Sequence, residues 1–117
     1  MKRTIKAANN AMDIKDIIIS TAEELGWNVT DYSENVVAVE LEYYCGNGLD
    51  GIADVSADSW ENFTDALADY AFYYDPEEEA LIEVQANGAP GIRAVLEDCD
   101  EFAEQLDELV AAIKSAI

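Results

Sequence analysis

Apolar and acidic side chains alternate along residues 36–44, which read Val36-Val37-Ala38-Val39-Glu40-Leu41-Glu42-Tyr43-Tyr44. Successive side chains of a β-strand point to opposite faces, so Glu40 and Glu42 share one face and the apolar residues between them share the other. The inward set is Val37, Val39, Leu41 and Tyr43. This pattern is typical of an antiparallel strand with one face on a core and the other in water. We predict a half-buried strand with an acidic outer face.

The flanking segments predict a single α+β domain over residues 1–117. Asp13 is a candidate cap for a first helix at 14–25, which Gly26 would stop. Further strands are predicted at 27–30, 49–56 and 81–85, and the turn between the second and third strands at 46–48. A second helix is predicted from a capping box of Asp58 and Glu61 to about Tyr74. Residues 86–91 are predicted to be a loop, and residues 1–12 a solvated, flexible basic N-terminus.

A long final helix is predicted from about Ile92 to the end of the chain, because apolar residues recur there at helical spacing. Its apolar seam consists of Ile92, Val95, Leu96, Cys99, Phe102, Ala103, Leu106, Leu109, Val110, Ile113 and Ile117. The predicted order is therefore α-β-β-β-α-β-α. Three strands form a meander, and the second helix brings in the fourth to complete a small, mainly antiparallel four-stranded sheet with helices on one face.

The charge of the chain excludes more classes of function than any motif does. Twenty-six acidic residues stand against six basic ones with no histidine, which gives a net charge of −20. From Asp16 onward there are 25 acids and two bases, Arg93 and Lys114. Disorder does not explain the excess, because half of the chain is apolar and periodic. Direct nucleic-acid binding and anionic membrane surfaces are disfavoured by repulsion, so we expect a basic partner.

The residue types argue against an enzyme, a metal centre or a bound cofactor. Without histidine, Ser-His and Cys-His nucleophile pairs cannot form. Gly46, Gly48 and Gly51 do not make a phosphate-binding motif, and zinc is disfavoured without clustered cysteines. A calcium-loop pattern of Asp31, Ser33, Asn35 and Glu42 carries Val36 where glycine is needed. The pattern favours a turn followed by a strand.

We expect a cytoplasmic protein. No apolar run reaches the length of a membrane span, and Asn9, Asn10 and Asp13 interrupt what would be the apolar region of a signal peptide. Cys45 and Cys99 lack paired spacing, so we predict buried thiols rather than a disulfide.

Rows of acids recur along the predicted helices. Glu61, Asp65 and Asp69 are spaced four apart on the second helix, opposite its apolar face. The final helix carries Glu97, Glu101, Glu104 and Glu108, flanked by Asp100 and Asp107. Neighbouring carboxylates in such a row lie about 6 Å apart, from a rise of ~1.5 Å per residue, which is comparable to the phosphate spacing of one nucleic-acid strand. Like charges at this spacing are mildly destabilising.

Two further acidic groups add to these rows. Glu40, Glu42, Asp50 and Asp54 form an array on the sheet, and Glu77, Glu78 and Glu79 form a loop cluster. Such arrays on rigid elements can imitate a phosphate backbone. Tyr73 and Tyr74 are candidate anchors, since tyrosine stacks on arginine.

With its acid rows and few basic residues, the chain resembles the small acidic anti-defence proteins of phages and conjugative elements, namely anti-CRISPR and ArdA-type antirestriction proteins. The segments 74–79 and 87–90 also look like parts of mobile-element proteins. The resemblance implies a stoichiometric inhibitor that occupies the DNA-binding or PAM-reading groove of a Cas9-type effector or a restriction enzyme. The phosphate surrogates would be Glu61, Asp65, Asp69, Glu97, Glu101, Glu104 and Glu108.

Other hypotheses stay open. The chain could be an acidic adaptor or immunity-type module for a basic protein, in which a hydrophobic hot spot matters more than charge spacing. It could also be a salt-adapted domain whose acids are a solvated surface. Spare apolar surface on the final helix leaves a homodimer open as well.

Overall fold

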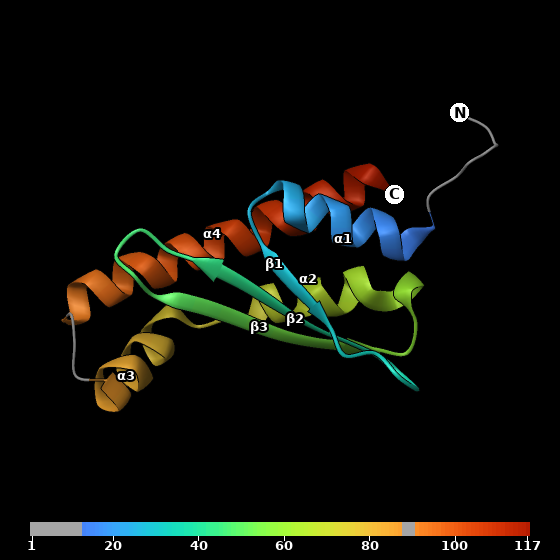
Figure 1. The fold of residues 1–117 in the computed structure, drawn as a ribbon. Coiled ribbons are helices and arrows are strands. Elements are labelled where there is room, and N and C mark those ends of the chain that lie inside the picture. Colours follow the sequence, from blue (N-terminus) through green and yellow to red (C-terminus); the bar gives the residue numbers. More distant parts are fainter. Residues whose placement is uncertain (1–12, 88–90) are drawn as a thin grey trace.

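Strand β2 (Val37–Tyr44) is the middle of a three-stranded antiparallel sheet in the computed structural model, which describes residues 13–87 and 91–117 (Figure 1). It pairs with β1 (Asn28–Asp31) on one side and with β3 (Asp50–Ala57) on the other. The strands follow one another along the chain and across the sheet, so the predicted meander is confirmed.

The two faces of the sheet differ as the alternation in β2 predicts. Val37, Val39 and Leu41 are buried, whereas Glu40 and Glu42 point to the opposite face. On β3 the buried residues are Gly51, Ala53 and Val55, and the exposed ones are Asp50, Ile52, Asp54 and Ser56. The paired strands therefore share an apolar inner face and an acidic outer face.

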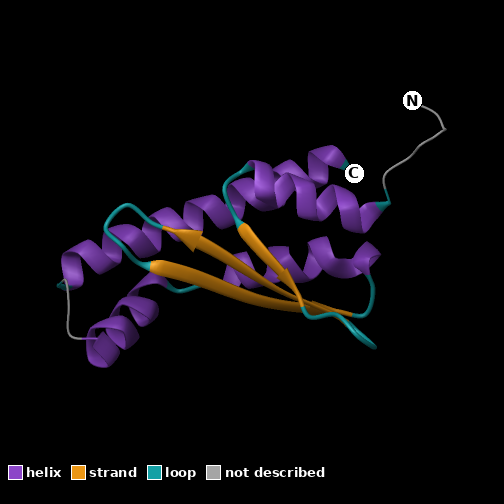
Figure 2. Ribbon diagram, in the orientation of Figure 1, coloured by secondary structure: helices purple, strands orange, loops and turns teal. Residues whose placement is uncertain are grey.

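Helices α1 (Ile14–Glu24), α2 (Phe63–Tyr73), α3 (Pro76–Asn87) and α4 (Ile92–Ala116) complete the described part of the chain. Figure 2 shows α1, α2 and α4 together on one side of the sheet, with the strands in front. Helix α4 packs against each of the other three helices. The protein is thus a single α+β domain, and no helix of the described residues covers the outer face of its sheet.

The core forms where α4 crosses the inner face of the sheet. Phe102, Leu106, Leu109 and Ile113 of α4 are buried there with Leu41 of β2. These α4 residues recur at helical spacing and confirm most of the predicted seam. Its two ends are wrong, because Ile92 and Ile117 are 54% and 59% exposed.

Gly51 lets α4 approach the sheet closely. A Cβ atom at this position would lie 2.2 Å from Cδ1 of Phe102, well inside van der Waals contact. The ring of Phe102 therefore lies directly on the backbone of β3. Glycine is required here because of this approach and not because of its backbone angles.

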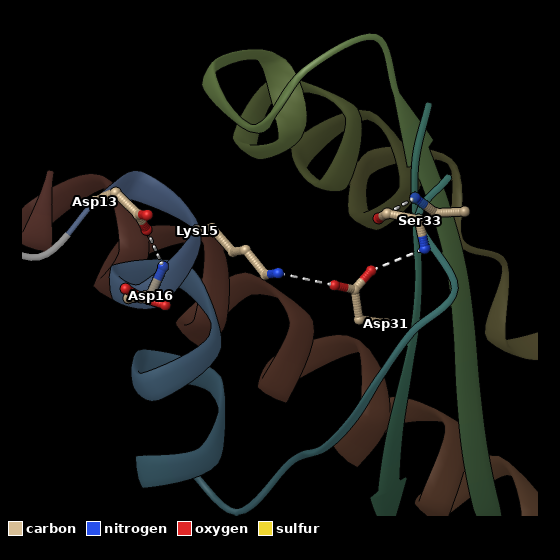
Figure 3. A network of polar contacts seen from close by, with 6 residues as sticks. Asp13, Lys15, Asp16, Asp31 and Ser33 are labelled. Atoms are coloured by element: carbon tan, nitrogen blue, oxygen red, sulfur yellow. Dashed lines mark hydrogen bonds and ion pairs between the residues drawn. The ribbon is translucent and has the colours of Figure 1, made fainter. Parts of the chain in front are cut away.

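Helix α1 begins where the sequence predicts and ends one residue before the predicted end, at Glu24. The Asp13 carboxylate accepts a 2.9 Å hydrogen bond from the backbone N–H of Asp16, and Gly26 follows the helix with φ of 94°. Lys15 joins α1 to β1 through a 3.3 Å ion pair with Asp31 (Figure 3). The pKa of Asp31 is lowered by hydrogen bonds from Ser33 and, to a smaller extent, by Lys15.

The predicted fourth strand at 81–85 is wrong, because these residues lie within α3. Pro76 occupies the first helical position, and the Asp75 carboxylate accepts hydrogen bonds from the backbone N–H groups of Glu77 (3.0 Å) and Glu78 (3.3 Å). Acidic residues in a first turn also favour a helix through its dipole. A short apolar run such as 81–84 does not distinguish a strand from a helix, and these start signals decided between them.

Three smaller expectations also change. The glutamates at 77–79 lie in the first turn of α3 and not in a loop, and α3 continues through the first two residues of the predicted loop at 86–91. Residues 60–62 form a short 3₁₀ turn before α2, so the capping box of Asp58 and Glu61 is wrong. Ser59 is the cap residue of the 3₁₀ turn and Asn62 that of α2, and neither makes a side-chain cap hydrogen bond.

The predicted flexible N-terminus at 1–12 lies outside the described residues, as do residues 88–90 of the predicted loop. Cys45 and Cys99 are buried free thiols, which confirms that prediction. Burial raises the pKa of Cys45 to about 12. Within the described ranges, we find no helix with the length and apolar character that a membrane crossing requires.

Candidate functional site

The outer face of the sheet gathers four acids from two strands. The register places Glu40 opposite Asp54 and Tyr44 opposite Asp50. Like charges directly opposite one another on a sheet are destabilising, so this arrangement works against the fold. Burial raises the pKa of Asp50 to about 6, assisted by a hydrogen bond with Glu42 and by the charges of Glu42 and Glu40. The four acids thus share one strongly negative surface.

The row on and before α2 is exposed throughout. Glu61 lies in the 3₁₀ turn, and Asp65 and Asp69 follow one helical turn apart on α2. On the opposite side of the helix, Phe63 and Leu67 are fully buried in the core. Packing therefore fixes the direction in which these carboxylates point.

The row on α4 divides into two halves. Glu97 accepts a 3.1 Å hydrogen bond from the Asn47 side-chain amide, and Glu101 accepts a 2.9 Å bond from the backbone N–H of Gly46. Both carboxylates therefore hold the β2–β3 turn against α4. Glu104 and Glu108 are exposed. Glu97 and Glu101 thus support the fold through hydrogen bonds, although Glu97 is exposed, as Glu104 and Glu108 are.

A further carboxylate on α4, Asp98, was missed by sequence reasoning. It is only 2% exposed and accepts hydrogen bonds from the backbone N–H groups of Asn47 (2.9 and 3.1 Å) and Leu49 (2.9 Å). Asp98 lies three residues after Val95 and four before Phe102, which is a position on the apolar seam. A carboxylate on a core-facing seam was the signal that could have found it, because burial obliges it to have donors.

Asp54 of β3 and Asp69 of α2 line the same surface hollow, of about 410 Å³. The hollow lies between β3, α2 and the start of α3, and its lining has no basic residue among the described side chains. Its remaining lining residues are Val55, Ser56, Ala66, Tyr70, Tyr73, Tyr74, Asp75, Glu78 and Glu79. We call it the acid–tyrosine hollow. It joins the outer face of the sheet to the α2 row.

The two predicted tyrosine anchors differ in exposure. Tyr73 is 78% exposed and packs edge-on against Phe72, with ring centroids 5.0 Å apart. Tyr74 is partly buried, and its ring lies 5.2 Å from that of Phe102. Burial raises the pKa of Tyr74 well above its ordinary value, so its hydroxyl stays protonated and neutral. Tyr73 is the one of the two with its ring available to a partner.

Tyr70 closes one wall of the hollow. Its hydroxyl donates a 3.2 Å hydrogen bond to the carbonyl oxygen of Ile52, which ties α2 to the edge of β3. Its ring stacks on that of Tyr74 at 6.4 Å between centroids. Burial raises the pKa of Tyr70, with further contributions from Glu79 and Asp54. The wall is therefore held by contacts within the protein.

Three residues of the calcium-loop pattern, Asp31, Ser33 and Glu42, make other contacts. Asp31 accepts a 2.9 Å bond from the backbone N–H of Ser33 besides its pairing with Lys15, and Glu42 lies on the outer face of β2 next to Asn28. Within residues 13–87 and 91–117, no three Cys, Asp or Glu side chains are grouped to hold a metal ion.

No protein family, curated protein or solved structure matches this chain. Two features of the site indicate which chemical groups it can bind. Carboxylates from a sheet and a helix face one hollow, and tyrosine rings stand among them. Guanidinium groups pair with carboxylates through several N–H donors and stack on aromatic rings, so arginine fits this lining better than any other side chain.

Proposed function

We propose that this protein is an acidic DNA mimic that binds the nucleic-acid groove of a host-defence nuclease, such as a Cas9-type effector or a restriction enzyme, and inhibits it. It acts in the cytoplasm of a bacterial host cell, without catalysis and in a stoichiometric complex. The observation that carries the proposal is the shared hollow of Asp54 and Asp69, because it joins sheet and helix acids into one surface.

The shape of the protein supports the same proposal. Its extents of 52 × 28 × 20 Å describe an elongated body, whose length corresponds to about fifteen base-pair steps at ~3.4 Å each. A protein groove that binds duplex DNA presents arginines and lysines along a comparable length of the duplex. Carboxylates on packed elements would meet these cations without having to reorganise.

The opposed acids supply a second line of support. Glu40 and Asp54 face each other across β2 and β3, which is unfavourable in the isolated protein. A cationic partner relieves this repulsion on binding. Contact with such a partner therefore yields more free energy than it would on a surface whose charges were already paired.

The test is a DNA-cleavage and DNA-binding assay with purified nucleases of both classes. We expect inhibition at about one protein per nuclease, release of bound DNA, and steep weakening with added salt. Asn substitution of Asp54 and Asp69 together should weaken inhibition strongly. The matched control is Glu23→Gln with Glu24→Gln, which removes the same charge from exposed positions on α1.

Three outcomes would contradict the proposal. Equal loss of inhibition in both double variants would mean that total charge acts without a defined surface. A nuclease that keeps its DNA while bound to the protein would indicate an adaptor instead. Unfolding of the protein at low salt, without binding to any nuclease in the panel, would indicate a salt-adapted domain.

A further inference from the structure

A second hollow, of about 530 Å³, opens between α3 and the first turns of α4. Four of its lining residues are apolar, namely Pro76 and Leu81 of α3 and Ile92 and Leu96 of α4. Leu81 and Ile92 are 52% and 54% exposed. We call it the α3–α4 groove. Its volume is within the ~300–1,000 Å³ range of sites that enclose a ligand or an anchoring side chain.

The groove lies beside the line along which α3 packs on α4. Ala80 is fully buried and packs with Val84 against Val95 and Cys99 of α4. Figure 1 shows α3 beyond the end of the sheet, at an angle to α4. The side chain of Leu81, one residue from this line, stays half exposed. Leu81 and Ile92 therefore leave apolar surface exposed at this point.

The charge at the rim of the groove determines which kind of partner the groove favours. Asp75, Glu77 and Asp100 line it together with the apolar residues. The nearby cation, Arg93, lines a separate hollow with Glu97. A second copy of this chain would bring a further charge of −20 toward these acids. Charge complementarity therefore favours an apolar side chain flanked by lysine or arginine.

Asp75 lines both the α3–α4 groove and the acid–tyrosine hollow. The first turn of α3 is thus the wall between the two sites. A single segment of a partner can cross this wall, with arginine on one side and an apolar residue on the other.

We propose that the α3–α4 groove binds an apolar side chain within a basic segment of the target protein, next to the arginine in the acid–tyrosine hollow. This inference rests on the proposed function and adds a second, apolar anchor to it. Burial of this anchor supplies affinity that salt does not screen. Charge steers the encounter, and the groove slows dissociation.

The test uses two synthetic 15-residue peptides with identical lysine and arginine content. One carries leucine and phenylalanine at its remaining positions, and the other carries serine and glutamine there. Fluorescence anisotropy with the full chain, in 0.15 M and 0.5 M NaCl, gives the two affinities. We expect the apolar peptide to bind at least about tenfold tighter, and to keep this advantage in high salt.

The variant Leu81→Ser with Ile92→Ser should remove that advantage. Ile82→Ser is the matched control, because Ile82 is 53% exposed on the same helix and does not line the groove. All three side chains are half exposed, so the variants should fold, and circular dichroism checks this. Equal binding of the two peptides, or equal loss in the control, would overturn the inference. So would a dimer that the double variant dissociates in sedimentation, because the occupant would then be a second copy.

This assay contains neither DNA nor nuclease, so the two proposals can fail separately. If the peptide preference depends on the groove but the nucleases are not inhibited, the mimic proposal fails and the groove remains a site for basic, apolar segments. If inhibition occurs and the two peptides bind equally, only the groove inference fails.

Discussion

The carboxylate of Asp98 on α4 accepts a 2.9 Å hydrogen bond from the backbone N–H of Leu49, on the far side of the β2–β3 turn. It also accepts two contacts from the N–H of Asn47. One buried carboxylate therefore accepts hydrogen bonds from two backbone N–H groups that lie in the turn, outside both strands. Glu101 extends the arrangement by accepting from Gly46. The acids of α4 thus position the turn between the two long strands as well as adding charge.

Replacing Asp98 with alanine should destabilise the fold by about 2–4 kcal/mol, because two part-buried N–H groups lose their acceptor. Urea denaturation at pH 7 measures this loss. Asp100→Asn is the control, since Asp100 is exposed on the same helix and should change stability by less than about 0.5 kcal/mol. An unchanged denaturation midpoint for the Asp98 variant would show that the turn does not depend on this carboxylate.

Gly51→Ala should destabilise by about 1–3 kcal/mol, because the new methyl group overlaps the ring of Phe102. Thermal unfolding measures the effect. Gly46→Ala is the matched control, since its Cβ would lie 3.5 Å from a carboxylate oxygen of Glu101, an ordinary contact. Combining Gly51→Ala with Phe102→Leu should recover part of the loss. If the two glycine variants are equally stable, close approach of Phe102 is not what requires glycine at 51.

The raised pKa of Asp50 predicts how stability changes with pH. The folded pKa of about 6 exceeds the ordinary 3.8, so the folded protein binds more protons between these values. This contribution to the free energy of unfolding is complete below pH 4 and is lost as pH rises through 6. Asp50→Asn removes the loss, and should stabilise the protein at pH 7 by a few tenths of a kcal/mol.

The check is chemical denaturation of both proteins at pH 4 and pH 7. The gain of Asp50→Asn should appear at pH 7 and be absent at pH 4. Asp65→Asn controls for the overall loss of one negative charge, because Asp65 lies on α2, away from the strand pair. A gain of equal size at both pH values would contradict the assignment to Asp50.

Asp75→Ala should loosen the first turn of α3 by about 1 kcal/mol, since it removes the acceptor for two backbone N–H groups. Hydrogen exchange of the amides of Glu77 and Glu78 should become about fivefold faster. Asp75→Asn retains a side-chain acceptor and should keep most of the protection. Equal exchange in all three proteins would mean that packing of Ala80 alone holds this turn.

Much of the fold could be predicted from local patterns. The alternation at 36–44 predicts β2 and its two faces, and Asp13 and Gly26 predict the ends of α1. Residues 81–85 could not be assigned in this way. The order of apolar and polar residues at 81–84 fits both the period of two of a strand and the period of 3.6 of a helix. Asp75 and Pro76 were the better evidence, because an Asp cap followed by proline at the first helical position is a helix start signal.

The residue types of the site could be predicted from the sequence, but their positions relative to one another could not. The rows on α2 and α4 follow from spacing within one helix. That Asp54 and Asp69 line one hollow depends on how α2 packs against β3, which no local pattern contains. The division of the α4 row likewise depends on the β2–β3 turn, which lies about fifty residues earlier in the chain.

The amino-acid sequence by itself determined the charge, the strand meander, the long amphipathic helix and the residues that face the core, because each follows from composition or from a period of two or 3.6 residues. Tertiary structure alone decided which acids support the fold, which tyrosine is exposed and where two hollows open beside α3. These depend on contacts between segments distant in the chain. A carboxylate on a helix has the same sequence context whether it meets a backbone N–H or a partner's arginine.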